Sequence, residues 1–282
     1  MKRIAAALLT LVMLLAFAQA ETVKFSGMEI NLDAAMIDFG KTRVTDAEGL
    51  AALIHRMPNL KEVKMYSSKL SAEQMDMLFY GFPDVFFGWT LRVGDHTVRT
   101  DQTAFSTLHT SSPKPAHKTK DFVKLKYCTR MLALDFGHNH VDDISFLAEM
   151  PQLRVLIIGQ NRVRNISVLS QLHDLEYLEL FSNRIYDWTP LVGLKKLKDL
   201  NIKYNPGSDI TPLFAMTWLE RFWAGFDKWQ IPGQFRKAME EAVPDCEYNW
   251  TQHPTGGTWR KHPRYFVIKE MFRTGKYIPF EE

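Results

Sequence analysis

The stretch LEYLELFSNRIYDWTPL, residues 175–191, contains the pattern that decides the fold. Apolar residues stand at fixed intervals on both sides of Asn183, and the same pattern occurs four times, each copy beginning 22 residues after the last. The copies begin at Met131, Leu153, Leu175 and Leu197. A repeat of this length predicts a solenoid, because one coil cannot bury its own apolar face and has to stack on its neighbours.

Each position in the repeat has a physical role. The L-x-L stretch predicts a short strand whose alternate side chains point into the core, and the following Asn predicts the turn that ends it. A buried Asn can hydrogen-bond backbone groups that the turn would otherwise leave unpaired. We therefore expect a ladder of stacked side chains, formed by Asn139, Asn161, Asn183 and Asn205.

These repeats resemble a known family, the bacterial leucine-rich repeats of the internalin type. The resemblance is carried by stretches such as NRIYDWTPLVGLKKL (183–197) and NPGSDITPLF (205–214), and it covers about residues 125–240. It implies an α/β repeat fold, a right-handed horseshoe with a parallel concave sheet and short 3₁₀ or helical turns behind it. It also implies protein or ligand binding in general, without naming a partner.

The flanks are less regular. Residues 34–83 predict two longer coils with helices over about 45–55 and 71–80. Residues 84–124 predict an inserted β-hairpin, turning at Gly94-Asp95, followed by a loop. After the fourth repeat comes a degenerate fifth, with Asp227 at the Asn position, and then an amphipathic capping helix over 233–242.

The N-terminal twenty residues read as a secretory signal peptide, with Lys2 and Arg3 before an apolar run and Ala18-Gln19-Ala20 at its end. The alternative is an uncleaved anchor, but the run is short for a span of about 20 residues. We expect a secreted or cell-surface protein with no membrane span after cleavage. The expected organisation is 1–20 signal peptide, 21–83 irregular repeats, 84–124 insertion, 125–242 regular repeats with cap, and 243–282 an aromatic-rich, folded tail.

Charge and cysteine content narrow the partners. The chain has 35 basic and 32 acidic residues, and removing the first twenty takes away only Lys2 and Arg3, so little net charge remains. Proteins that bind nucleic acid need a surplus of basic residues to neutralise the phosphates. We therefore expect that this protein does not bind nucleic acid. Four repeats separate Cys128 from Cys246, too far for a disulfide, so both should be unpaired and buried. We expect a monomer.

Few residues suggest catalysis or metal binding. His138-Asn139-His140 spells the letters of an HNH nuclease, but Asn139 belongs to the ladder. His138 and His140 with Asp142 and Asp143 could hold a metal in principle, although turn acids commonly bond local backbone instead. Five further histidines show no sequence partner, namely His96, His109, His117, His253 and His262. We therefore expect no catalytic residue, no metal and no cofactor.

The concave face is the candidate binding surface. The repeat register places aromatic and charged side chains on its solvent side, clustered towards the C-terminal coils: Tyr177, Glu179, Phe181, Asp199, Lys203, Tyr204, Arg221, Trp223 and Phe226. Aromatics beside Arg are typical of interface hot spots. The alternative is that the C-terminal tail covers this strip. The expected function is binding of a protein partner, with carbohydrate binding and an enzyme acting through the insertion or tail as alternatives.

Overall fold

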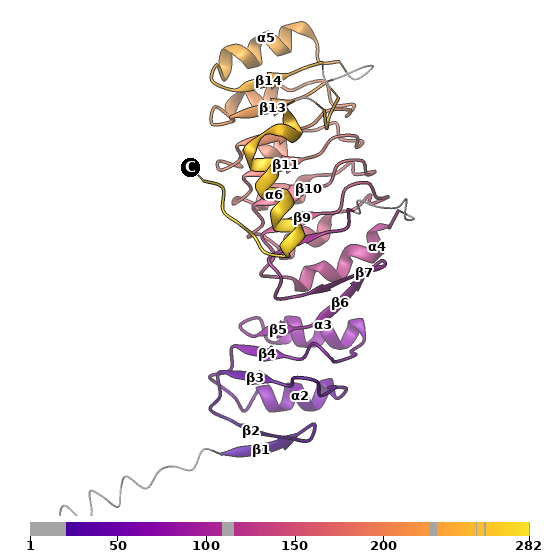
Figure 1. Ribbon diagram of the computed structural model, residues 1–282, viewed down its shortest axis with the longest axis vertical. Helices are drawn as coiled ribbons and strands as arrows, with labels where there is room; N and C mark the ends of the chain where they lie inside the picture. The colour runs from indigo at the N-terminus through magenta and orange to yellow at the C-terminus, as the bar shows by residue number, and fades with distance from the viewer. Residues whose placement is uncertain (1–20, 109–115, 226–229, 252, 257, 282) are drawn as a thin grey trace, which may run out of the picture. The chain divides into compact units, whose positions relative to one another are not determined.

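The computed structural model (Figure 1) describes residues 21–108, 116–225, 230–251, 253–256 and 258–281. The expected signal peptide therefore lies outside the described residues. The chain divides into two compact units, which meet in sequence between Trp89 and Thr90 and are described separately.

The N-terminal unit contains a hairpin and two helical coils. Strands β1 (Thr22–Phe25) and β2 (Met28–Asn31) pair antiparallel. A parallel three-stranded sheet follows, built from β3 (Met36–Asp38), β4 (Glu62–Lys64) and β5 (Phe86–Gly88). We expected β5 inside the insertion, but its parallel pairing with β4 makes it the next strand of these coils.

The two predicted helices are present on this unit. Helix α2 (Ala47–Ile54) begins at Asp46, whose carboxylate accepts a hydrogen bond from the Gly49 amide at 2.8 Å. Helix α3 (Ala72–Gly81) begins with a capping box, in which the side chains of Ser71 and Gln74 bond each other's backbone amides. Such caps satisfy amides that have no partner within the helix.

The C-terminal unit is a stack of coils around a seven-stranded sheet. Every neighbouring pair of strands is parallel, and strand order follows sequence order. The strands are β8 (Ala104–Ser106), β9 (Ala133–Asp135), β10 (Val155–Ile157), β11 (Tyr177–Glu179), β12 (Asp199–Asn201), β13 (Arg221–Trp223) and β14 (Glu247–Asn249). The solenoid is confirmed, and β8 and β14 extend the sheet beyond the predicted repeats by one strand at each end.

Short helices form the opposite side of each coil. They are α4 (Thr119–Phe122) and the 3₁₀ helices η1 (Val123–Tyr127), η2 (Ser145–Glu149), η3 (Ser167–Gln171), η4 (Thr189–Leu191) and η5 (Thr211–Ala215). The predicted hairpin is formed by β6 (Thr90–Val93) and β7 (His96–Arg99). Helix α5 (Gly233–Ala242) packs against η5 at the end of the stack, where the capping helix was predicted. Asp227, expected at the fifth Asn position, lies outside the described residues.

The asparagine ladder is confirmed. The side-chain amide of Asn183 donates to the carbonyls of Ile158 at 2.9 Å and Leu180 at 3.0 Å, and its oxygen accepts from the Val163 amide at 3.0 Å. Asn161 and Asn205 bond the neighbouring coils in the same way. Each Asn thus satisfies backbone groups of its own turn and of the preceding coil.

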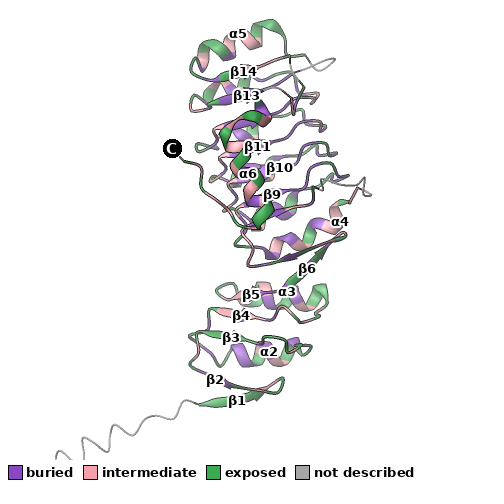
Figure 2. Ribbon diagram, viewed as in Figure 1, coloured by how far each residue is buried: buried purple, intermediate pink, exposed green. Residues whose placement is uncertain are grey.

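The core is formed by the inward-facing residues of successive coils, and burial is continuous along the stack (Figure 2). Both cysteines are buried and free, as predicted. Within the described residues, no helix combines the length and the apolar character needed to cross a bilayer. The last helix, α6 (Pro263–Thr274), does not continue the stack but lies across the sheet (Figure 1).

Candidate functional site

The concave face is covered by the chain's own C-terminal segment, which we define as the described residues of 258–281. This segment contains the 3₁₀ helix η6 (Trp259–Lys261) and helix α6, which contacts β8 and β9. The predicted exposure of the concave strip is therefore wrong. Seven residues of the strip are no more than 2% exposed, and five of them contact the segment: Tyr177, Glu179, Asp199, Arg221 and Trp223. The other two buried residues are Phe181 and Lys203.

Glu179 is the first polar anchor of the segment. Its carboxylate accepts hydrogen bonds from Trp259 Nε1 at 3.0 Å and from both terminal nitrogens of Arg260, at 2.5 and 2.7 Å. The hydroxyl of Tyr177 donates to the same carboxylate. Burial, and then the Glu179 charge, raise the pKa of Tyr177 well above its usual range, so the hydroxyl keeps its proton. The buried carboxylate thus accepts from four donors, two of which belong to the bidentate Arg260 guanidinium, and this compensates its charge.

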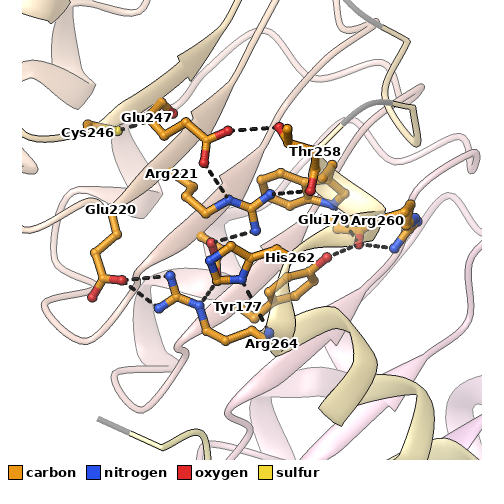
Figure 3. A network of polar contacts seen from close by, with 12 residues as sticks. Tyr177, Glu179, Glu220, Arg221, Cys246, Glu247, Thr258, Arg260, His262 and Arg264 are labelled. Atoms are coloured by element: carbon orange, nitrogen blue, oxygen red, sulfur yellow. Dashed lines mark hydrogen bonds and ion pairs between the residues drawn. The ribbon is translucent and has the colours of Figure 1, made fainter.

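Asp199 is the second anchor. Its oxygens form ion pairs with Arg221 at 3.2 Å and with Arg264 of α6 at 2.9 Å. Arg264 also bonds Glu220 at 2.6 Å, so one side chain of the segment bridges two coils (Figure 3). The Arg221 guanidinium lies 4.5 Å from the centre of the Trp259 ring. The acidic residues that the repeat register predicted to face solvent, Glu179 and Asp199, are thus paired with arginines of the tail.

Apolar contacts complete the cover. Trp259, Ile268 and Met271 are fully buried and form one cluster with side chains of the sheet. The Trp259 ring lies 5.5 Å from that of Tyr177 and 5.3 Å from that of Trp223. The sheet side of this cluster consists of Ala104, Ala133, Val155, Ile157, Tyr177 and Trp223. The aromatic strip is therefore the second hydrophobic core of the unit, and not an open surface.

The remaining predicted residues lie toward the strand ends. Lys203 is buried and donates to the Ala224 carbonyl at 3.1 Å. Burial lowers the pKa of Lys203 to about 7. Tyr204 is half-buried, with its ring centre 6.0 Å from that of His253. Phe226, also predicted for the binding face, lies outside the described residues.

A pocket remains open between α6 and the first strands of the sheet, and we call it the α6 pocket. It has a volume of about 670 Å³. Ser106, Asp135 and Ile157 line it from the sheet, whereas the α6 side is mainly apolar. Leu108 and Phe266 belong to its lining and are 47% and 56% exposed. The lining from α6 is Tyr265, Phe266, Ile268, Lys269, Glu270, Phe272 and Arg273.

Asp135 is the buried acid of this pocket. Its carboxylate accepts hydrogen bonds from the Gly137 amide at 2.9 Å and the Ser106 hydroxyl at 3.0 Å. Burial raises the pKa of Asp135 to about 6, and the two hydrogen bonds oppose this shift. An apolar pocket with one convergent polar group of shifted pKa is the usual form of a ligand site.

The metal candidates considered from sequence are not brought together. His138 and His140 line a shallow polar groove along the strand ends, together with Arg162 and Arg184. Two guanidinium groups in that groove disfavour a cation. Asp142 instead accepts a hydrogen bond from Thr119, and Asp143 caps the Ser145 amide. One feature of the sequence could have indicated that the tail covers the strip: the basic residues Arg260 and Arg264 are complementary in charge to the acidic residues Glu179 and Asp199.

Comparison with known proteins gives only structural matches. Neither known protein families nor curated proteins match the sequence. Among solved structures, internalin C2 from Listeria monocytogenes is 22% identical, covers 70% of this chain and 72% of its own, and gives a TM-score of 0.36. An internalin from the same species, inlF, is 17% identical; the match covers 82% of this chain and 73% of inlF, with a TM-score of 0.41. A leucine-rich-repeat protein of Leptospira interrogans is 12% identical, covers 86% and 59%, and scores 0.39.

Three features of this chain define its fold: coils that recur every 22 residues, a parallel sheet with one strand per coil, and an asparagine ladder. The chain has the leucine-rich-repeat solenoid fold, and the solved structures that it resembles are internalins and other leucine-rich-repeat proteins.

Proposed function

We propose that this protein is an exported binding module that recognises a protein partner through the α6 pocket. The observation that carries the proposal is the pair of exposed apolar side chains, Leu108 and Phe266, beside an open and mainly apolar pocket. Apolar side chains grouped around a concavity favour insertion of an apolar anchor from a partner. Lys269 and the ion pair of Arg273 with Glu270, which also line the pocket, offer polar groups around that anchor.

We infer a binding role in preference to a catalytic one because the polar groups of the concave strip are engaged in holding the C-terminal segment. Glu179 and Asp199 pair with Arg260 and Arg264. The concave face then contributes to recognition indirectly, by positioning α6 as one wall of the pocket. The proposed binding surface therefore differs from the open strip that we expected from the sequence, because it is formed by both the sheet and the tail.

The test uses the mature chain as bait for surface proteins. The double variant Leu108→Asp/Phe266→Asp places charges at two exposed positions, so it should fold normally while losing the partner. The matched control is Tyr186→Asp, because Tyr186 is 65% exposed and does not line the pocket. We expect a partner retained by the wild type and the control, and lost by the double variant.

A photoreactive residue at position 266 should crosslink to the same partner, whereas one at position 186 should not. Capture that is undiminished in the double variant would refute the proposal. Binding of the wild type to a glycan array, with no protein captured, would replace it with carbohydrate recognition.

A further inference from the structure

We propose that Asp95, His96 and His117 form a binding site for a divalent transition-metal ion of the zinc class. These residues lie where the β6–β7 hairpin meets the first regular coil, away from the α6 pocket, and the proposal does not depend on the proposed function. Both imidazole Nε2 atoms point to Asp95 Oδ1, at 3.1 Å from His96 and 2.8 Å from His117. The three ligand atoms lie within 4.8 Å of one another.

The set of donors selects the kind of ion. Two imidazoles and one carboxylate are typical ligands of zinc and its neighbours, whereas calcium and magnesium prefer oxygen ligands alone. In a tetrahedral site with metal–ligand bonds of about 2.0 to 2.1 Å, the donor atoms are roughly 3.3 Å apart. The two separations from Asp95 Oδ1, 2.8 and 3.1 Å, would open by about 0.2 to 0.5 Å, and the two imidazole nitrogens lie within 4.8 Å of each other.

The backbone holds one ligand in place. His117 donates its amide hydrogen to Asn139 Oδ1 at 2.8 Å, and its carbonyl accepts from the His140 amide at 2.8 Å. The segment before α4 is therefore bonded to the first Asn of the ladder. Gly94 at the hairpin turn has a φ of 58°, and a Cβ there would lie 2.3 Å from the His117 ring. Only glycine allows this turn to approach the imidazole so closely.

Aromatic rings fix both imidazoles. The His96 ring meets that of Phe105 edge-on with centres 6.0 Å apart, and the His117 ring meets that of Phe122 at 6.2 Å. The two histidine side chains are only 9% and 13% exposed, whereas Asp95 is 35% exposed. Preorganised, poorly hydrated imidazoles with one solvent-facing carboxylate suit a site with three protein ligands and one open position.

The ion would join the hairpin to the segment before α4, which is itself hydrogen-bonded to Asn139 and His140 of the first regular coil. Metal bound only by the folded state stabilises that state. Binding would therefore fasten the hairpin to the segment before α4 through His117, and the fourth position of the ion would stay open to water. His96 and His117 are separated by twenty intervening residues, so no metal-ligand spacing is visible in the sequence.

The experiment measures Zn²⁺ binding to the untagged mature chain by calorimetry, with Co²⁺ as a spectroscopic substitute. We expect one ion per chain, the visible absorption of tetrahedral Co²⁺, a higher thermal midpoint with Zn²⁺, and no competition by Mg²⁺ or Ca²⁺. His96→Gln and His117→Gln should each weaken binding by more than the roughly 10- to 100-fold that loss of an outer partner costs.

The control is His140→Gln, because this exposed residue lies on the neighbouring coil and outside the cluster. It should bind Zn²⁺ like the wild type. If a histidine variant fails to fold, Asp95→Asn decides, since it keeps a carbonyl oxygen for hydrogen bonding but removes the charge. No Zn²⁺ binding by the wild type, or equal binding by the wild type and the folded ligand variants, overturns the proposal.

Discussion

At the scale of single residues, the side chains of the repeat divide into those whose role follows from their position and those whose role depends on the tail. The ladder asparagines belong to the first group. Their partners are backbone groups of adjacent coils, which the repeat places at fixed distances. Glu179 and Asp199 belong to the second group, because they pair with Arg260 and Arg264 of the tail, and the same strand positions face solvent in a coil that nothing covers.

Asn183→Ala should lower the free energy of unfolding by about 1 to 3 kcal/mol, because it leaves the buried Val163 amide without a partner. It also removes one of the two side-chain donors to each of the Ile158 and Leu180 carbonyls, which keep Asn161 and Asn205. Urea denaturation measures the change. The control is Asn165→Ala, which removes one exposed hydrogen bond to the Ser167 amide and should cost less than about 1 kcal/mol. An equal loss of free energy of unfolding in the two variants would show that the ladder position contributes no more to stability than an exposed asparagine does.

Lys203 gives a pH prediction. Its pKa in the folded protein is about 7, against a usual 10.5, so between these values the unfolded chain binds the extra proton and stability rises with pH. Relative to Lys203→Met, the wild type should gain up to about 1.4 kcal/mol per pH unit above pH 7. Urea denaturation at pH 7, 8 and 9 measures this difference. A constant difference across the three pH values would contradict the lowered pKa.

At the scale of elements, each strand of the regular coils is buried on both faces. Strands β9 to β13 carry no exposed residue, because the core fills one side and the C-terminal segment covers much of the other. Helix α6 is thus part of the folded unit as much as any coil. The 3₁₀ helices behind the sheet are short enough for the 22-residue period, as the resemblance to internalin-type repeats implied.

Trp259→Ala should destabilise the C-terminal unit by about 3 to 5 kcal/mol, because it empties the centre of the tail cluster and removes a donor from Glu179. Denaturation should show the loss, and hydrogen exchange should show faster exchange in α6. Tyr186→Ala, at an exposed position, should change stability by less than about 0.5 kcal/mol. Unchanged protection of α6 in Trp259→Ala would mean that the tail is held by other contacts.

At the scale of the whole molecule, the stack protects groups at both ends of the regular coils. Cys128 is fully buried and Cys246 is 7% exposed. Burial raises the pKa of both thiols, to about 12 for Cys246. Neither side chain has the exposure or the positive surroundings of a reactive thiol.

Both thiols should therefore react with a thiol reagent at least about a thousandfold more slowly in the folded protein than in urea. Time-resolved labelling followed by mass spectrometry of peptides measures the two sites separately. Because the label needs the thiolate, the comparison is made at one pH. Rapid labelling of either cysteine in the native protein would show that its end of the stack opens locally.

The sequence by itself determined the repeat, the parallel sheet, the ladder, the helical N-terminal coils and the capping helix. These follow from contacts between residues a fixed distance apart, which recur and can be counted along the chain. The solvent-facing strip was predicted from the same register, but its exposure was wrong. Only the tertiary structure decided that Arg260 and Arg264 reach Glu179 and Asp199 across more than sixty residues of chain.

The histidine cluster was likewise decided only by the tertiary structure. His96 and His117 come from a hairpin and a separate segment, and nothing periodic links them. Contacts of this kind depend on where a non-repeating segment folds back, which is settled by the sum of burial and charge pairing over the whole unit. Periodic contacts could therefore be read from one sequence, whereas the tail cover, the α6 pocket and the histidine cluster required the folded chain.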